Sequence, residues 1–181
     1  LSGGGMAEEN ILSYRDINTP IGSLRLVGNG ETLYHLYFSP GNQPENHTND
    51  WIEEKFSFEG VVEQLKTYFA KQSKSFDIDV YLKGTHFQKL VWEQIRSIPF
   101  GETQTYAKLA ELIGRPKAVR AVGAAIGANP IPIIIPCHRV IGSNQSLTGF
   151  SGGLEKKVYL LRHEGAEIDN GFVLDAKIWA A

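Results

Sequence analysis

The first third of the chain alternates apolar and polar residues in short runs, which is the pattern of half-buried β-strands. Turn-forming residues, Thr19-Pro20 and the stretch from Gly28 to Gly30, separate these runs. Because short connections join strands that run in opposite directions, the pattern predicts a mostly antiparallel sheet. The predicted strands are Ile11–Ile17, Ile21–Val27 and Thr32–Phe38.

The pattern changes twice before residue 84. A polar stretch from Ser39 to Asp50 is rich in Pro, Asn and Gly, and we expect a loop there. Phe58–Lys71 has the apolar spacing of a helix, and Phe76–Leu82 alternates like another half-buried strand. We therefore expect a small N-terminal α/β domain over residues 6–83. The residues before Met6 lack the basic and apolar regions of a signal peptide, and we expect them to be an appended segment.

Helical periodicity dominates from residue 84 onwards. Thr85 is placed to cap one helix, which stops before Pro99, and Thr105 to cap a short second helix, which ends at Gly114. Pro116 stands where the first residue of a third helix would. Two short helices joined by about three residues that include glycine form a helix-turn-helix candidate. The expected inward residues of this third helix are Val119, Val122 and Ile126.

The opposite face of the third helix combines one long cation with very small residues. Arg120 lies there with Ala121, Ala124 and Gly127. Small side chains let a helix backbone approach another surface closely, and an arginine can enter a DNA groove. The alternative is a helix packed tightly against its neighbour with Arg120 in solvent. Spacing alone leaves both readings open.

The predicted fold class is α+β. A small N-terminal α/β domain with a mostly antiparallel sheet precedes a mainly helical C-terminal domain, residues 84–166, that contains the helix-turn-helix. In residues 167–181, Asp169-Asn170-Gly171 lies between two short apolar segments. We expect a small hairpin or a loosely ordered tail there.

Composition narrows the class of protein. No apolar run approaches the roughly 20 residues that span a membrane, and a single cysteine cannot form an internal disulfide or a multi-cysteine zinc site. The net charge of −2 hides an asymmetry. Residues 1–83 carry 7 Lys and Arg against 12 Asp and Glu, whereas residues 84–165 carry 10 against 5. The basic excess in the second part is compatible with a surface that faces phosphate.

The cysteine lies in an unusual apolar stretch, Asn129–Ile141. Prolines at positions 130, 132 and 136 forbid a regular helix, so Cys137 is expected on a stiff, extended path. An isolated cysteine in such surroundings can be inert packing. The alternative is a nucleophile, because His138 follows directly and Glu164 ends a later helix, and a histidine oriented by a carboxylate can take a thiol proton. Asn129 could fix a backbone turn.

An ordered set of motifs now identifies a family. Pro136-Cys137-His138-Arg139-Val140 resembles the active-site signature of the O6-alkylguanine-DNA alkyltransferases. Further segments match the family in order and spacing, strongly over Thr85–Gly165 and in outline before it. They are Ile98–Glu102, Thr105-Tyr106, Pro116–Gly123, Asn129-Pro130 and Gly149–Gly153.

The resemblance implies a single-use DNA repair protein that reverses O6-alkylguanine and O4-alkylthymine damage. Cys137 would accept the alkyl group irreversibly from a base rotated out of the duplex. His138 would act as its base through a water molecule, Glu164 would hold His138, and Asn129 would tie the turn together.

The resemblance also implies binding to the minor groove of double-stranded DNA. Tyr106 would crowd the phosphate of the target nucleotide, and Arg120 would fill the vacated place in the stack. The guanine pocket would be lined by the backbone of Val140 and by Ser151, with Arg115 and Ser143 at the DNA backbone. Phe150 stands where many relatives have Tyr, so the pocket wall lacks a hydroxyl and the tolerance of different alkyl groups is expected to change.

No cofactor or metal is expected. Relatives that bind zinc in the first domain use cysteines, which are absent here, and His35, His47 and His86 are scattered. We expect a cytoplasmic monomer that has no membrane or obligate protein partner and that associates with the nucleoid when bound to DNA. The alternatives are a cysteine hydrolase using Cys137, His138 and Glu164, a DNA-binding regulator, and a sensor that binds alkylated DNA without transfer. Turnover and the fate of the thiol distinguish them.

Overall fold

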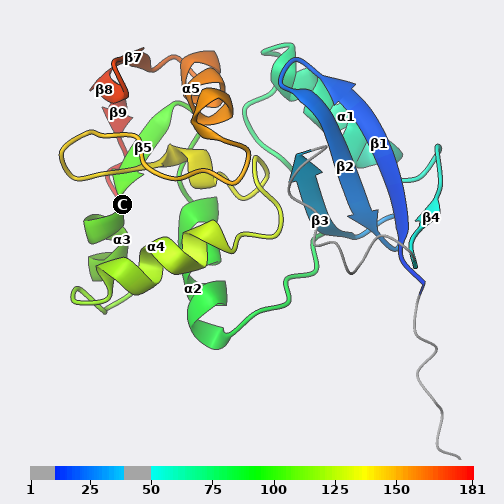
Figure 1. Ribbon diagram of the computed structural model, residues 1–181, viewed down its shortest axis with the longest axis horizontal. Helices are drawn as coiled ribbons and strands as arrows, with labels where there is room; N and C mark the ends of the chain where they lie inside the picture. The colour runs from blue at the N-terminus through cyan, green and yellow to red at the C-terminus, as the bar shows by residue number, and fades with distance from the viewer. Residues whose placement is uncertain (1–10, 39–49) are drawn as a thin grey trace, which may run out of the picture.

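The computed structural model describes residues 11–38 and 50–181, which form two domains that lie side by side (Figure 1). The predicted appended segment before Met6 and the predicted loop from Ser39 onwards, except for Asp50, lie outside the described residues. Where the chain is described, no helix is long and apolar enough to cross a membrane.

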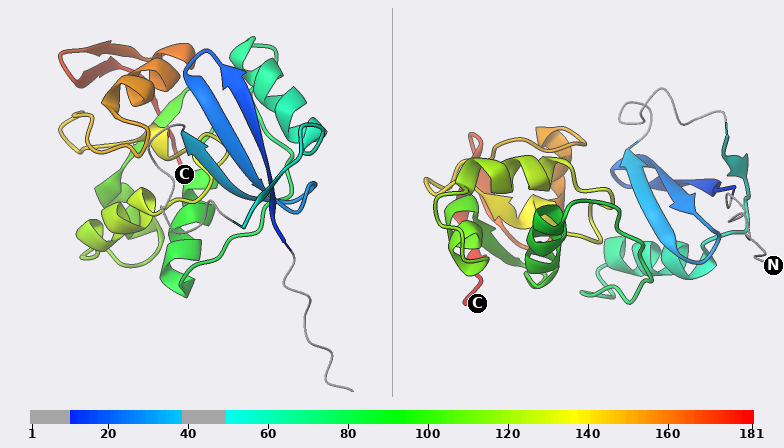
Figure 2. Two further views of the ribbon diagram at one scale, coloured as in Figure 1. Left: turned by 45° about the vertical axis from the view of Figure 1, so that its right-hand side comes forward. Right: turned by 90° about the horizontal axis from the view of Figure 1, so that it is seen from below.

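The N-terminal domain is a four-stranded sheet with one helix against it. The strands are β1 (Ser13–Thr19), β2 (Gly22–Gly28), β3 (Leu33–Phe38) and β4 (Ile52–Glu53), in the order β3-β2-β1-β4. The β1–β2 and β2–β3 pairs are antiparallel and β1–β4 is parallel, which confirms the mostly antiparallel sheet. Helix α1 (Glu59–Phe69) covers one face (Figure 2), where its buried Val62 and Leu65 belong to the same core as Leu24 and Leu26.

The strand predicted at Phe76–Leu82 is not formed as a strand. Only an isolated parallel bridge joins Val80 to Leu33, with the Leu33 amide donating to the Asp79 carbonyl at 2.9 Å. The same outer edge of β3 also bonds to the C-terminal domain, because the Leu36 amide donates to the Pro130 carbonyl at 2.9 Å. The edge is therefore shared between two segments, and neither can extend into a full strand.

Four helices build the C-terminal domain: α2 (His86–Arg96), α3 (Tyr106–Leu112), α4 (Val119–Gly127) and α5 (Leu154–His163). Both predicted caps are present. Thr85 forms a capping box with Gln88, and the Thr105 hydroxyl accepts from the Lys108 amide at 3.1 Å. The indole N–H of Trp92, a fully buried residue of α2, donates to the Ala125 carbonyl of α4 at 2.8 Å and fixes the two helices together.

The helix-turn-helix is present, but its turn is longer than predicted. Helix α3 ends in a Schellman motif in which Gly114, at φ 75°, donates to Glu111, and Arg115 donates to Ala110. Pro116 lies within the turn instead of opening α4, because residues 115–118 form a separate turn closed by the Ala118 amide and the Arg115 carbonyl. Helix α4 begins only at Val119, which is 37% exposed and not inward as predicted.

The chain end forms the predicted hairpin and an additional strand. Strands β7 (Glu167–Asp169) and β8 (Phe172–Asp175) are antiparallel around Asn170 and Gly171, both at positive φ. The chain then continues into β9 (Lys177–Ile178), which pairs in parallel with β5 (Glu102–Thr105), itself paired with β6 (Val140–Ile141). The segment after residue 166 is thus integrated into the C-terminal domain, a feature that the sequence pattern did not reveal.

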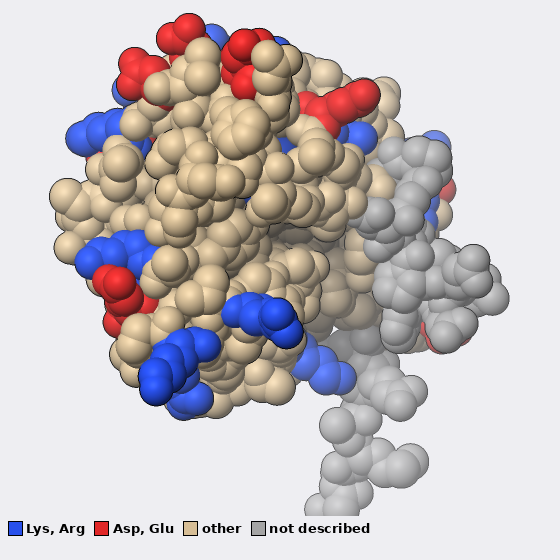
Figure 3. Space-filling model, turned by 60° about the vertical axis from the view of Figure 1, so that its left-hand side comes forward, with Lys and Arg blue, Asp and Glu red and all other residues tan. Residues whose placement is uncertain are grey.

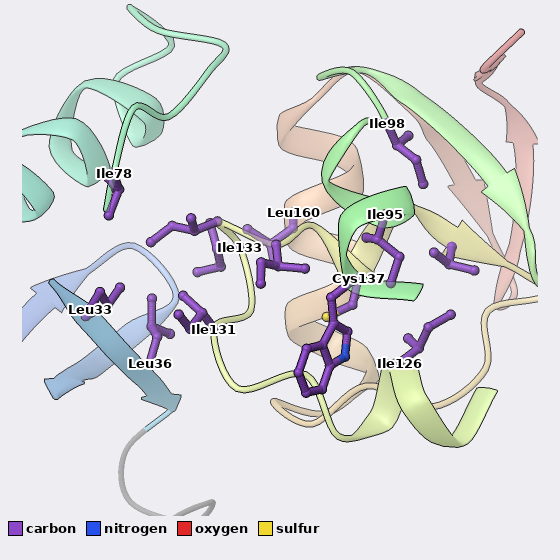
Figure 4. Close-up of a cluster of buried hydrophobic side chains, with 14 of the residues drawn as sticks. Leu33, Leu36, Ile78, Ile95, Ile98, Ile126, Ile131, Ile133, Cys137 and Leu160 are labelled. Carbon is purple, nitrogen blue, oxygen red and sulfur yellow. The ribbon is translucent and has the colours of Figure 1, made fainter. Parts of the chain in front are cut away.

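One continuous hydrophobic core joins the two domains. Figure 4 shows Leu33 and Leu36 of β3 close to Ile131 and Ile133 of the loop that leads to Cys137. The α+β class is confirmed, whereas the predicted boundaries at residues 83 and 166 stay predictions. The loop that carries Cys137 packs between the two domains. Residues of either domain can therefore contact this loop.

Candidate active site

Cys137 begins a single 3-10 turn, Cys137–Arg139, and not an extended segment. Three prolines limit the approach to this turn, and Ile133 takes a left-handed conformation with φ 74° that bends the path. The Arg139 amide closes the turn by donating to the Pro136 carbonyl at 3.0 Å. Adjacent side chains diverge on such a tight turn, so Cys137 and His138 serve different surroundings.

Asn129 ties this loop together, as the sequence predicted. Its Nδ2 donates to the Ile135 carbonyl at 2.8 Å, and its Oδ1 accepts from the Ile131 amide at 2.9 Å. The Asn129 side chain is itself buried. Both ends of a buried amide are thereby satisfied within the loop, which fixes the backbone immediately before Cys137.

Glu164 meets His138 in the fully buried interior, although 26 positions separate them. Helix α5 ends with Glu164 as its C-cap and with Gly165 at φ 103°, and this sharp end directs the carboxylate inward. His138 Nε2 lies 2.6 Å from Glu164 Oε2. Because a carboxylate can only accept, Nε2 carries the hydrogen and Nδ1 is left with a lone pair. Nδ1 is buried and has no hydrogen-bond partner among the described protein atoms.

Two further residues hold the same carboxylate. Arg139 donates through Nε to Glu164 Oε1 at 2.7 Å and through a second nitrogen to Oε2 at 3.1 Å. Tyr68, which α1 of the N-terminal domain supplies, donates its hydroxyl to Oε2 at 2.6 Å. The Gly101 amide completes the set at 3.2 Å.

The environment sets the protonation of this network. Burial alone would raise the pKa of Glu164, but His138 and the Arg139 guanidinium outweigh it and hold that pKa well below its ordinary value. Burial lowers the pKa of His138, and this effect exceeds the opposing pull of Glu164. At neutral pH the site therefore holds an ionised Glu164 paired with Arg139, beside a neutral imidazole that is free to accept a proton at Nδ1.

Burial also raises the pKa of the Cys137 thiol, which is 5% exposed. The Asn129 side chain and the charge of Lys157 act in the opposite direction without cancelling the effect of burial. Lys157 is fully buried, and its ammonium donates to the Val140 carbonyl at 2.7 Å and to the Thr148 carbonyl at 3.0 Å. Burial lowers the pKa of Lys157 to about 8. The resting cysteine is a thiol that needs a base when it reacts.

A cavity of about 680 Å³ opens onto Cys137 from the helix-turn-helix side. The predicted residues Tyr106, Arg120, Ser143, Phe150 and Ser151 line it. The Tyr106 hydroxyl lies 3.5 Å from the Thr148 carbonyl, and burial raises its pKa, so it is a protonated donor at neutral pH. The remaining lining residues are Val119, Gly123, Ile126, Gly127, Gly142, Thr148 and Gly149.

Among the residues predicted to contact DNA or the base, Val140 and Arg115 do not line this cavity. Val140 is fully buried, and its carbonyl accepts from Lys157 instead of facing the cavity. Arg115 is exposed in the turn before α4, with its guanidinium 5.6 Å from the ring centre of Phe87. Exposed Lys117 lies in the same turn, and exposed Arg120 follows at the start of α4. Figure 3 shows several basic side chains along the lower edge of one face of the molecule.

Sequence reasoning missed Lys157 and Tyr68. Lys157 lies three positions before the buried Leu160 and seven before Glu164, so helical spacing already places it on the inward face of α5. No comparable signal marks Tyr68, because its partner lies 96 positions away in the other domain. Within residues 11–38 and 50–181, no three His, Cys, Asp or Glu side chains gather so that they could hold a metal ion.

The fold and the site define a class of protein in which a reactive cysteine lines a cavity beside a helix-turn-helix. Family models described as the ribonuclease-like domain and the DNA binding domain of 6-O-methylguanine DNA methyltransferase match residues 12–82 and 86–166. The chain belongs to this family.

Known members are similar along nearly their whole length. The methylated-DNA–protein-cysteine methyltransferase of Methanosarcina acetivorans is 46% identical over 153 residues, which is 84% of this chain and 98% of that protein. The Mycobacterium tuberculosis protein of the same name is 45% identical over 154 residues, 85% and 93% of the two chains. The crystal structure of M. tuberculosis OGT in complex with DNA has a TM-score of 0.79 at 45% identity and covers 84% of this chain and 92% of that chain.

Proposed function

We propose that this chain repairs DNA by moving the alkyl group of O6-alkylguanine onto Cys137 Sγ, once per protein molecule. The relatives are named for transfer of methyl groups from DNA to a protein cysteine, and Cys137 is the only cysteine in the sequence. The observation that carries the proposal is the position of this thiol. It ends a cavity bordered by the helix-turn-helix and is followed directly by a neutral histidine held by a buried carboxylate.

The reaction is a displacement at the alkyl carbon. Sγ forms a bond to that carbon while the bond from carbon to O6 breaks, and the electron pair leaves on guanine. His138 Nδ1 is the acceptor available for the thiol proton, and a water molecule bridges the two because their side chains diverge on the turn. Guanine takes up a proton in turn, so the charges balance. The product is a thioether, which has no leaving group that water could replace, and the protein is used up.

Two neighbours favour the thiolate as it forms. Lys157 supplies a positive charge to a site that burial makes poor in solvent, and Asn129 supplies a hydrogen bond. Both are fixed by bonds to the backbone of the surrounding loops. The thiol is therefore unreactive at rest and activated when its proton leaves.

Access to the alkyl carbon requires the base to leave the duplex, at a cost of a few kcal/mol. The exposed face of α4, with Ala121, Ala124 and Gly127, is small enough for close approach to the minor groove. Arg120 stands at the mouth of the cavity, where it can enter the stack as the base rotates inward. Tyr106 lies on the same rim and can contact the phosphate of the target nucleotide.

The test is a titration of the protein with a duplex that carries one O6-methylguanine, followed by intact mass. We expect a gain of one methyl group that saturates at one equivalent, and no gain for Cys137→Ser. A repeating reaction without a mass change would indicate a hydrolase. Tight binding with an unchanged mass would indicate a damage sensor. A parallel duplex with O4-methylthymine tests whether the cavity accepts the smaller ring.

A further inference from the structure

We propose that Tyr68 is a positioning residue of the alkyl transfer: from the N-terminal domain, its hydroxyl holds the carboxylate oxygen that binds His138, and so sets how strongly Glu164 draws on the imidazole. This inference rests on the proposed function, since it assigns Tyr68 to the step in which His138 takes the thiol proton. It makes the N-terminal domain a part of the reaction centre.

The Tyr68 hydroxyl is buried and is held against the Glu164 carboxylate. Tyr68 is 1% exposed, and its hydroxyl and His138 Nε2 both lie 2.6 Å from Glu164 Oε2. Its ring is enclosed on several sides by aromatic neighbours, so the hydroxyl cannot swing to solvent. These neighbours are Phe69, Phe76, Phe100 and His163, with ring centres 4.9–5.9 Å away.

The hydroxyl adds a hydrogen bond without adding a charge. Arg139 already balances the charge of Glu164. An oxygen that accepts two short hydrogen bonds is a weaker acceptor for each than an oxygen that accepts one. Tyr68 therefore limits the pull of Glu164 on the Nε2 hydrogen, which would otherwise make the imidazole hold an extra proton at Nδ1. Burial and the charge of Glu164 raise the pKa of Tyr68 far above its ordinary value, so it remains a donor.

Several charged or titratable groups act on His138, and only Tyr68 can be changed without altering the charge of the network or the nucleophile. Glu164 and Lys157 act on it from α5, Arg139 from its own turn, which Cys137 begins, and Tyr68 acts from α1 through Glu164. His163 lies behind the Tyr68 ring. Changing any of the first four alters the charge or the nucleophile, whereas Tyr68→Phe removes one oxygen and leaves the net charge intact.

The experiment is the rate constant of methyl transfer from an O6-methylguanine duplex, measured on the full chain across the pH range in which imidazole titrates. For Tyr68→Phe we expect the midpoint of the acidic limb to rise by on the order of one pH unit, because Oε2 then accepts from His138 and only the longer Arg139 bond, and the imidazole holds its proton to higher pH. The matched control is Phe76→Leu, which thins the same aromatic cluster and keeps the hydroxyl. Its midpoint should equal that of the wild type.

A second variant keeps the idea testable where Tyr68→Phe is too unstable to study. Tyr68→3-fluorotyrosine preserves the ring and makes the hydroxyl a stronger donor, so the midpoint should move in the opposite direction, to lower pH. A Tyr68→Phe profile that is unchanged, or lower at every pH with the same midpoint, would overturn the inference. An equal shift in Phe76→Leu would do so too. Failure of the wild-type protein to gain a methyl group would instead refute the proposed function itself.

Discussion

Glu164→Gln is expected to cost far more stability than its single-atom change suggests. The carboxylate accepts five hydrogen bonds, from His138, Tyr68, Gly101 and, twice, Arg139. An amide keeps one oxygen and replaces the other by a donor, which would face Arg139 Nε or the Tyr68 and His138 donors. Arg139, only 6% exposed, would also lose its counter-charge. Breaking a buried pair of this kind costs about 3–5 kcal/mol.

The assay is thermal and denaturant unfolding of both proteins at several pH values. At neutral pH the melting temperature should fall by roughly 6–20 °C, since a protein of this size loses about 2–4 °C per kcal/mol. The pKa of Glu164 is lowered from its ordinary 4.5 in the folded protein. Its stabilisation is therefore complete above that value and is lost as the pH falls below it. The difference between wild type and variant should shrink in the same acidic range.

Glu59→Gln is the matched control, because Glu59 makes an ion pair with Arg15 at the surface with a side chain that is 66% exposed. Removing an exposed pair should cost at most about 1 kcal/mol. A Glu164→Gln variant no more destabilised than Glu59→Gln would contradict this prediction. So would a stability difference between Glu164→Gln and wild type that is independent of pH in acid.

Three further predictions concern reactivity. Since burial lowers the pKa of His138 below its ordinary 6.5, the transfer rate should stay level as the pH falls to 6.5 and decline only below that value. A midpoint at or above 6.5 in a stopped-flow pH series would contradict this prediction. Lys157→Met removes a charge that lowers the pKa of the Cys137 thiol, so alkylation of the thiol by iodoacetamide at neutral pH should slow severalfold. An unchanged rate would count against that role. Arg120→Ala should slow repair of duplex DNA by roughly ten- to a hundredfold, because base rotation costs a few kcal/mol. The reaction with free O6-benzylguanine should stay unchanged. Equal slowing of both reactions would place Arg120 in the chemical step and not in DNA binding.

Sequence predicted the parts of the fold that depend on local signals. Thr85 and Thr105 cap their helices as expected, and Gly165 ends α5 so that Glu164 turns inward. Pro116 was misplaced because a first-turn proline and a proline in the turn before a helix have the same local signature. Only the Schellman motif at Gly114 shows that the connection is longer.

The remaining errors concern contacts between distant segments. The strand predicted from Phe76 has the right alternation, but whether it pairs depends on how much of the β3 edge Pro130 leaves free. Strand β9 is two residues long and carries no periodicity that could announce it. The residues of the site also fall into those that the sequence places together and those that only the fold brings together. Cys137 and His138 are adjacent in sequence, whereas the contribution of Tyr68 exists only once the two domains are packed.

The most direct measurement is the location of the transferred group. Wild-type protein is treated with one equivalent of duplex carrying O6-methylguanine and digested, and the fragment that spans Cys137 is sequenced by tandem mass spectrometry. We expect a methyl group on Cys137 Sγ in nearly every molecule, together with unmodified guanine in the recovered strand. A methyl group on His138 or Lys157, or repaired DNA beside an unmodified cysteine, would contradict it.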